Sequence, residues 1–279
     1  MRNIVSPTRT MSTSAPKGLI EAETLSDAWV AALRNVVDPG SSRSSPTIVS
    51  FTRFEPDGRP CEVALIRDAV DLELKSRGLV NVETNAAMIF PIGNLQLLEA
   101  RLGRNASIGE LSGYYRDRVF PRLSAANRRA NRKGTYFLRM ISFGADPRTD
   151  QSTGENQIKK LLEIWQNNPH IPQSVLQLAI RDPARDLTHN PRPFFPCLQQ
   201  VSFAYDNESG ISITGYYPTQ YIFDRAYGNY LGLSNLGNFV AREMNRKLVR
   251  VNCICSNPLI GSPKKTALQQ FVRGLDRKQ

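Results

Sequence analysis

The chain has 279 residues and carries 36 Lys and Arg against 25 Asp and Glu, which gives a formal net charge of +11. Its 41% hydrophobic and 22% charged residues match ordinary globular proteins and exclude a disordered chain, a collagen-like fibre and a coiled coil. Its apolar runs all fall short of the roughly 18 residues that span a bilayer, so we expect no membrane partner. The length favours one large domain, alone or with a small appendage.

The two ends of the chain differ in composition from the middle. The first 17 residues contain three basic residues, no acidic residue and several Ser and Thr, which is typical of a flexible basic arm. A transit peptide is the alternative interpretation of this segment. The C-terminal segment is also basic, and we expect it to be exposed. The predicted organisation is a flexible arm, a single domain and a basic tail, over residues 1–20, 21–262 and 263–279.

Cysteine and histidine usage favours a reducing compartment and no metal site. None of the four cysteines belongs to a C-x-x-C pair, and four in a chain of this length do not form a disulfide framework. We therefore expect a cytoplasmic protein. With two histidines and no metal-ligand spacing, we expect no zinc site.

Hydrophobic periodicity predicts both helices and strands in chain order. Helical spacing marks residues 25–37, a helix ending near 79, a helix ending near 166, and a long helix from 222 to about 245. Ser152 and Glu155 are predicted to form a capping box ahead of the third of these helices. Strand-like patterns mark 47–51, 174–180, 198–205, 211–221 and 248–255.

Basic residues are concentrated in the segment 101–139, which has ten Lys and Arg against two acidic residues. Tyr114, Tyr115 and Tyr136 lie among them. Lys and Arg neutralise phosphates and aromatic rings stack on bases, so one interpretation is a groove for nucleic acid. The other is a solvated helical face of a basic protein, and we prefer it.

The order of motifs in the second half resembles the thymidylate synthase superfamily. Glu155–Ile158, followed by a helix and Asn168-Pro169, is similar to the family's run of Asp-Gln-Ile, helix and Asn/Asp-Pro. Pro196-Cys197 resembles the Pro-Cys-His motif of the catalytic thiol, and Tyr230–Leu233 resembles the Phe-Leu-Gly-Leu segment. The match covers roughly residues 150–256 and depends on the ordered set. It implies an α/β (α+β) fold with one large mixed sheet, flanked by helices and paired across its face with a second copy as a homodimer.

The resemblance also implies a reaction. A Cys197 thiolate would add to C6 of a pyrimidine nucleotide and make C5 a nucleophile toward the one-carbon unit of 5,10-methylenetetrahydrofolate. Such a thiol needs a lowered pKa, for which Arg181, Arg185 and Arg192 lie close upstream. The alternative is that Cys197 is a small buried hydrophobe. His189 is a candidate general base for Cys197, and a surface loop histidine is the alternative that we prefer.

Several binding positions depart from the family pattern. Where the family has a pair of phosphate-binding arginines, this chain has Pro172 and Gln173. Pro218 stands where the family has a further phosphate-binding arginine. Proline cannot donate a backbone hydrogen bond, so these positions do not hold phosphate in the family manner. The histidine after the catalytic cysteine is replaced by Leu198. The candidate substrate contacts that remain, besides the upstream arginines, are Tyr217, Arg225, Asn229, Asn235 and Asn238.

The expected function depends on the candidate asparagines and on the departures from the family's phosphate-binding pattern. An amide offers a donor and an acceptor to the N3/O4 edge of a pyrimidine, although Asn235 and Asn238 also suit helix capping or a polar helix face. The departures argue against the standard dUMP-to-dTMP reaction. We expect a divergent methyl- or hydroxymethyltransferase that acts through Cys197. The alternative is an inactive protein of the same fold that binds a nucleotide, nucleic acid through residues 101–139, or a protein partner.

Overall fold

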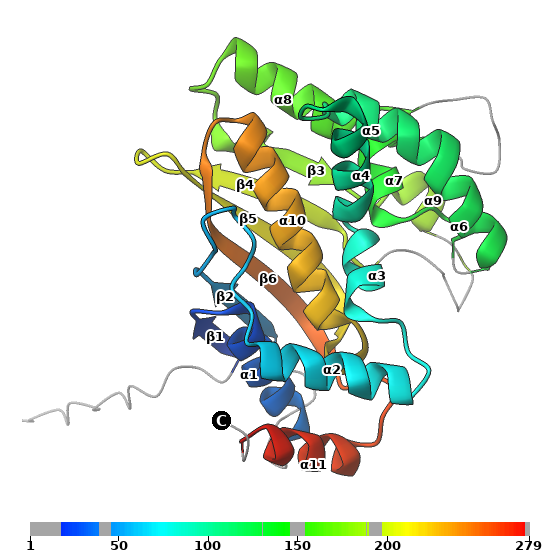
Figure 1. The fold of residues 1–279 in the computed structure, drawn as a ribbon, viewed down its shortest axis with the longest axis vertical. Coiled ribbons are helices and arrows are strands. Elements are labelled where there is room, and N and C mark those ends of the chain that lie inside the picture. Colours follow the sequence, from blue (N-terminus) through cyan, green and yellow to red (C-terminus); the bar gives the residue numbers. More distant parts are fainter. Residues whose placement is uncertain are drawn as a thin grey trace, which may run out of the picture.

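The fold is built on one mixed sheet with helices packed against it (Figure 1). This computed structural model describes residues 18–38, 46–129, 131–145, 154–187, 189 and 197–276. The six strands lie in the order β1-β2-β6-β5-β4-β3, with β1–β2 and β5–β6 parallel and the other pairs antiparallel. Their bounds are β1 (Leu19–Ala22), β2 (Thr47–Phe51), β3 (Gln177–Ala179), β4 (Gln200–Tyr205), β5 (Gly210–Tyr221) and β6 (Lys247–Leu259).

The helices fall between and around these strands. The α-helices are α1 (Leu25–Val37), α2 (Ala64–Ser76), α3 (Val82–Ala87), α4 (Ile92–Leu102), α5 (Ile108–Tyr114), α6 (Phe120–Ala126), α7 (Tyr136–Ile141), α8 (Gln157–Asn167), α9 (Pro183–Asp186), α10 (Tyr227–Glu243) and α11 (Lys265–Asp276). Two π-helical turns, η1 (Tyr115–Val119) and η3 (Ile222–Ala226), lead into α6 and α10, and η2 (Gln173–Val175) is a 3₁₀ turn.

Helix α10 packs directly on the centre of the sheet. Glycines make this close approach possible on both sides of the contact. A Cβ atom on Gly237 of α10 would lie 2.9 Å from side-chain atoms of Ile213 and Leu248, and one on Gly215 of β5 would lie 2.8 Å from Leu233. Both are shorter than ordinary van der Waals contact, so larger residues would force the helix away from the sheet.

The two faces of the sheet differ in burial. The row of paired positions under α10 is buried from one edge to the other; it consists of Ile20, Val49, Cys253, Gly215, Val201 and Leu178. The neighbouring row, which points to the opposite face, includes the exposed side chains of Leu19, Ile48 and Tyr216. Alternation along each strand therefore places an apolar but uncovered strip on that face.

Most of the predicted elements are present. Helix α1 and strand β2 have the predicted bounds, and β5 runs to Tyr221 with Ile213 and Tyr217 buried on the α10 side. The predicted capping box does not start α8: Asn156 is the N-cap and its side chain accepts a hydrogen bond from the Lys159 amide at 3.0 Å, while Ser152 lies outside the described residues. Strand β3 is shorter than predicted, because η2 precedes it.

The expectation of an exposed C-terminal tail was wrong. Residues of that segment form α11, whose side chains Leu268, Val272 and Leu275 are buried. The Phe271 ring lies 6.4 Å from that of Trp29 in α1. These apolar residues recur every three or four positions, which is the helical period, and the basic residues Lys264 and Arg273 are exposed.

Helix α11 is therefore expected to contribute to the stability of the domain. Replacing Leu268 by Ala should lower the free energy of unfolding by about 2–4 kcal/mol, because it opens a cavity against α1. Urea denaturation followed by circular dichroism measures this change. Gln270→Ala on the exposed side of the same helix is the control and should change it by less than about 0.5 kcal/mol. Equal effects of the two substitutions would show that α11 does not pack as described.

Candidate functional site around Cys197

Cys197 lies where the chain approaches strand β4. It is half-buried, and the next residue, Leu198, is fully buried under α10 beside Gly215. The backbone N–H of Gln199 then donates to the Tyr216 carbonyl at 2.9 Å, so the segment runs alongside β5 before β4 begins. The thiol is thus fixed at the end of the sheet where β5 leads into η3.

Of the residues that the structure describes, Arg225 is the charged one that changes the pKa of the Cys197 thiol. Burial raises the pKa of Cys197, and the Arg225 guanidinium opposes this without reversing it, so the pKa stays above the ordinary value of a thiol. Cys197 is therefore a thiol, not a thiolate, at neutral pH in the ligand-free protein. The lowered pKa that the nucleophile role requires is not present before a substrate binds.

The upstream arginines do not supply this field in the described part of the chain. Arg181 is exposed, and the Arg185 guanidinium donates to the Ala145 carbonyl. Arg192 lies outside the described residues. Among the described residues, Arg225 is the charged side chain that acts on Cys197.

Arg225 is held in place while its guanidinium stays exposed. It lies in η3, and its Nη1 donates to Asn85 Oδ1. Asn85 is itself fixed, because its Nδ2 donates to the carbonyls of Asp224 at 3.1 Å and Val80 at 3.2 Å. The neighbouring Asp224 carboxylate accepts bonds from the backbone and hydroxyl of Ser262, at 3.0 and 2.6 Å, so it is already engaged. The site thus presents an oriented cation to an incoming anion.

Tyr136 contacts Cys197 and was missed by sequence reasoning, which grouped it only with the basic segment. It is the first residue of α7, and the backbone groups of Cys197 and Leu198 lower the pKa of its hydroxyl, so the hydroxyl lies next to this segment. Burial raises the pKa of Tyr136, and the Cys197 thiol raises it further, so the hydroxyl keeps its proton. No sequence signal could have found this contact, because it joins segments about 60 residues apart through tertiary packing alone.

A set of buried polar atoms without partners lies beneath this position. Among the described residues, Tyr217 Oη, Tyr230 Oη and Gln220 Nε2 are fully buried and make no hydrogen bond. Gln220 Oε1 accepts from the Cys253 thiol at 3.7 Å. Burial raises the pKa of Tyr217, with smaller contributions from Cys253, Tyr136 and Cys197, which places its hydroxyl among these groups. Unpartnered buried hydroxyls are costly, so this cluster is an exception to the usual pairing of buried polar atoms.

The asparagines divide into two groups. Asn229 and Asn235 of α10 are buried, and no hydrogen bond joins their side-chain amides to any described residue. Asn238 makes a structural contact, which was the alternative to substrate binding. Its Nδ2 donates to the Asp57 carbonyl at 3.0 Å, in the turn before Gly58. The first two amides therefore keep their hydrogen-bonding capacity for another molecule, and that of Asn238 is partly used.

His189 is exposed and makes no contact with the thiol that changes the pKa of Cys197. This position matches the surface-loop interpretation. It leaves the Cys197–Tyr136–Arg225 group without a histidine among the residues that the structure describes.

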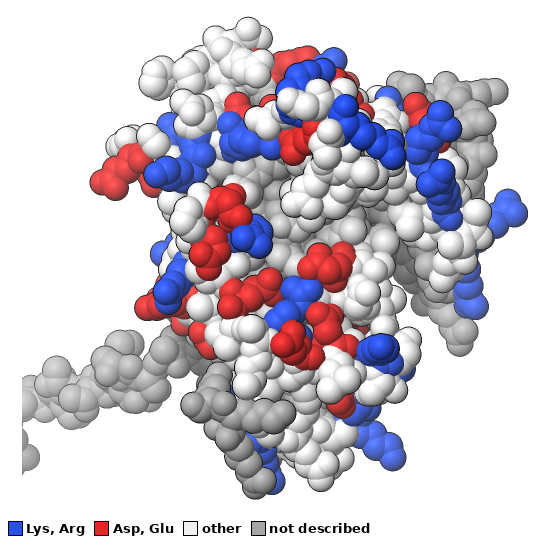
Figure 2. All heavy atoms as spheres, viewed as in Figure 1, with Lys and Arg blue, Asp and Glu red and all other residues white. Residues whose placement is uncertain are grey.

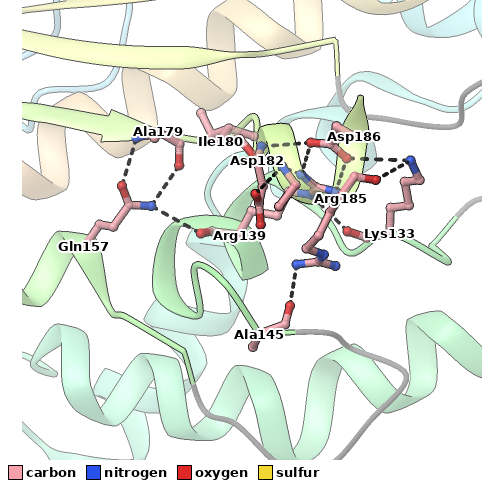
Figure 3. A network of polar contacts seen from close by, with 10 residues as sticks. Lys133, Arg139, Ala145, Gln157, Ala179, Ile180, Asp182, Arg185 and Asp186 are labelled. Atoms are coloured by element: carbon pink, nitrogen blue, oxygen red, sulfur yellow. Dashed lines mark hydrogen bonds and ion pairs between the residues drawn. The ribbon is translucent and has the colours of Figure 1, made fainter. Parts of the chain in front are cut away.

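A buried ion pair anchors the segment upstream of Cys197 (Figure 3). Arg139 of α7 contacts Asp186 of α9 through two bonds, Nη1 to Oδ2 at 2.6 Å and Nη2 to Oδ1 at 3.0 Å. Arg139 also donates to the carbonyls of Ile180 at 3.0 Å and Lys133 at 2.9 Å. Lys133 Nζ lies 3.7 Å from the same carboxylate. Almost every polar atom of the pair is engaged, which a buried pair requires.

The comparisons with known proteins add no relatives. Neither the search against models of protein families nor the search of curated proteins found a match. Within the described ranges, no group of three or more His, Cys, Asp or Glu could hold a metal ion. The helices described here also include none that is long and apolar enough to cross a membrane.

Breaking the Arg139–Asp186 pair should destabilise the protein. Burial would raise the pKa of Asp186, but the bonds from Arg139 and the Asp182 amide and the nearby positive charges outweigh it, so the pKa is lowered. The stabilisation is therefore present above about pH 4 and is lost as the pH falls below that value. Asp186→Asn should cost about 3–5 kcal/mol at pH 7, because it leaves the Arg139 charge buried and unpaired.

Urea denaturation of the wild-type protein and Asp186→Asn at several pH values measures this effect. The difference between them should be constant above about pH 5 and should narrow below about pH 4. Asp117→Asn, an exposed carboxylate, is the control and should behave as the wild type. A pH-independent difference would contradict the assigned role of the Asp186 charge.

Proposed function

We propose that this protein is a divergent thymidylate synthase-like transferase that adds a one-carbon unit to C5 of a pyrimidine nucleotide through Cys197. The observation that carries the proposal is the half-buried Cys197 thiol beside the exposed, oriented Arg225 guanidinium. The mixed sheet flanked by helices agrees with the fold that the motif order implies. A thiol with packing as its sole role would need neither a cation nor unpartnered polar groups around it.

In the proposed reaction, the Cys197 thiol gives its proton to solvent water and the sulfur forms a bond to C6 of the ring. The electron pair of the C5=C6 bond moves toward C5 and O4, and C5 attacks the methylene carbon of methylenetetrahydrofolate as one of its C–N bonds breaks. The C5 proton passes to water, the second C–N bond breaks to release tetrahydrofolate, and water adds to the exocyclic methylene carbon as the C6–S bond breaks, which yields the 5-hydroxymethyl nucleotide. A hydride from the folate in place of water would yield the 5-methyl nucleotide and dihydrofolate. Arg225 supports the first step, because its charge stabilises the thiolate against the cost of burial.

The neighbouring groups have roles that fit this sequence. The Tyr136 hydroxyl, which lies next to the backbone of Cys197 and Leu198, is proposed to orient the sulfur. The amides of Asn229 and Asn235, which have no partner among the described residues, are proposed to read the N3/O4 edge of the pyrimidine. An anionic group of the substrate is proposed to bind Arg225.

The one-carbon donor is a second substrate. The resemblance makes 5,10-methylenetetrahydrofolate the donor to test first, and none of the described residues is assigned to it. We also propose a homodimer formed across the uncovered face of the sheet, where Leu19 and Ile48 are 47% and 41% exposed in the isolated chain. A second copy would remove this apolar strip from water.

The test is tritium release from nucleotides tritiated at C5. The wild-type protein should release tritium from a uracil or cytosine nucleotide, and Cys197→Ser should reduce the rate at least about 1,000-fold, because the nucleophile is lost. Cys61→Ser is the matched control, since that thiol contacts Glu55 away from the site. If no nucleotide of either base releases tritium, with or without methylenetetrahydrofolate, the proposed function is wrong.

The role of Arg225 can be measured without a substrate. In a Cys61→Ser background, the alkylation of Cys197 by iodoacetamide should speed up as the pH rises through and beyond 9, because its pKa lies above the ordinary value. Arg225→Gln should shift this pH profile upward, since the charge that lowers the pKa is removed, and Arg225→Lys should shift it less. Identical profiles for all three proteins would mean that Arg225 does not act on the thiol.

A further inference from the structure

A run of arginines on and after η1 and α6 is not used by the proposed transferase. We call it the arginine strip, and its members are Arg116, Arg118, Arg122, Arg128, Arg129 and Arg132. Asp117 is the one acidic residue within this run, so its net charge is +5. Two other arginines of the predicted groove are already paired with carboxylates, Arg104 with Glu110 and Arg139 with Asp186.

Helical geometry places part of the strip on one exposed side. In η1 and α6, Tyr115 and Phe120 are buried, and Arg118 and Arg122 are exposed. These two arginines are four residues apart, so they lie about one turn from each other. Arg128 and Arg132 follow in the turn after α6 and are also exposed. Four exposed guanidinium groups therefore follow one another along this surface.

Four of these arginines, Arg118, Arg122, Arg128 and Arg132, have no carboxylate partner among the described residues, unlike basic residues elsewhere on the same face of the molecule. Figure 2 shows basic and acidic side chains intermixed around α2 and α3. There, Arg67 donates to Glu62, Asp71 and Glu83 at 2.7 to 2.8 Å. Where α6 lies, at the right of Figure 2, Lys and Arg dominate over Asp and Glu. Within the described residues, no ion pair joins Arg118, Arg122, Arg128 or Arg132 to a carboxylate.

The chemistry of the strip fits phosphates better than bases. Guanidinium groups bind phosphate oxygens through paired hydrogen bonds. Single-strand binders add exposed aromatic platforms, and no aromatic side chain of the described part of 101–139 is among the exposed large hydrophobic residues. Between Arg118 and Arg128, the exposed residues other than arginine are Pro121, Ala125, Ala126 and Asn127. Among these four, Asn127 is the one whose side chain can hydrogen-bond to a base edge, so most of this surface is suited to phosphate contacts.

We propose that the arginine strip binds the phosphate backbone of duplex DNA without sequence preference. Duplex DNA carries one phosphate charge per about 1.7 Å of its axis, so its backbone presents closely spaced phosphates to a row of arginines. The binding depends on the charge of the strip alone. It is independent of the proposed transferase activity, because none of its arginines belongs to the site around Cys197.

Fluorescence anisotropy with a labelled 20-base-pair DNA duplex tests the proposal. Four neutralised phosphates predict a slope of about −3.6 in log affinity against log salt concentration, so affinity should fall roughly 100-fold between 50 and 200 mM NaCl. The triple variant Arg118→Gln, Arg122→Gln, Arg128→Gln should bind at least about 10-fold more weakly at 50 mM NaCl. For this variant, the slope of log affinity against log salt concentration should be less steep by about 2.7.

A matched variant with the same change in net charge is the control. Lys75→Gln, Lys264→Gln, Arg273→Gln neutralises three exposed side chains on or beside α2 and α11 and should bind within about 2-fold of the wild type. Equal losses in the two triple variants, or no binding of the wild type at 50 mM NaCl, would overturn the proposal. Tighter binding of single-stranded DNA or of duplex RNA would overturn it as well.

Cys197→Ser separates this proposal from the proposed reaction. That variant should bind the DNA duplex as tightly as the wild type while it loses tritium release. Loss of DNA binding in Cys197→Ser would place the DNA at the thiol instead of at the arginine strip.

Discussion

The buried ion pair between Arg139 and Asp186 is the interaction on which the position of Cys197 depends. Arg139 belongs to α7, and through Asp186 and the Ile180 carbonyl it holds the chain well upstream of the thiol. Tyr136, three residues earlier on the same helix, lies next to the backbone of Cys197 itself. One six-residue helix therefore fixes the chain on both sides of the segment that delivers the thiol. This makes the geometry of the site a property of the core, since α7 is buried almost throughout.

Two opposing electrostatic effects act on the Cys197 thiol: burial favours the protonated form and the charge of Arg225 favours the thiolate. Burial keeps Cys197 protonated, and the exposed Arg225 offers a charge that is not consumed by any carboxylate bond of the described residues. The anionic group that is proposed to bind Arg225 would partly offset the stabilisation that Arg225 gives the thiolate, whereas a neutral ring at the thiol would leave this stabilisation unchanged. The balance between these two effects, and not the pKa of the ligand-free protein alone, determines how much of Cys197 is a thiolate when a substrate is bound.

Sequence periodicity predicted the elements whose burial alternates simply. Helix α1 and strands β2 and β5 follow from their own residues, because one face of each is apolar along its whole length. Helix α11 was missed because its charge was given more weight than the spacing of Leu268 and its apolar neighbours. In the candidate site, the sequence predicted Cys197 and Arg225 among the functional residues, and the structure places Arg225 close enough to lower the pKa of Cys197. The contact of Tyr136 depends on tertiary packing, which no local pattern encodes.

The π-helical form of η3 has a consequence for how the site could have arisen. Such a turn contains one residue more than an α-helical turn, and a single inserted residue rotates the residues before it by about 100° relative to the helix after it. The insertion separates the direction of Arg225 from that of α10, which stays packed on the sheet. Because Ile222 and Phe223 of the same turn are buried in the core, a change in its length would rotate them together with Arg225, so the position of the cation is tied to the packing of the core.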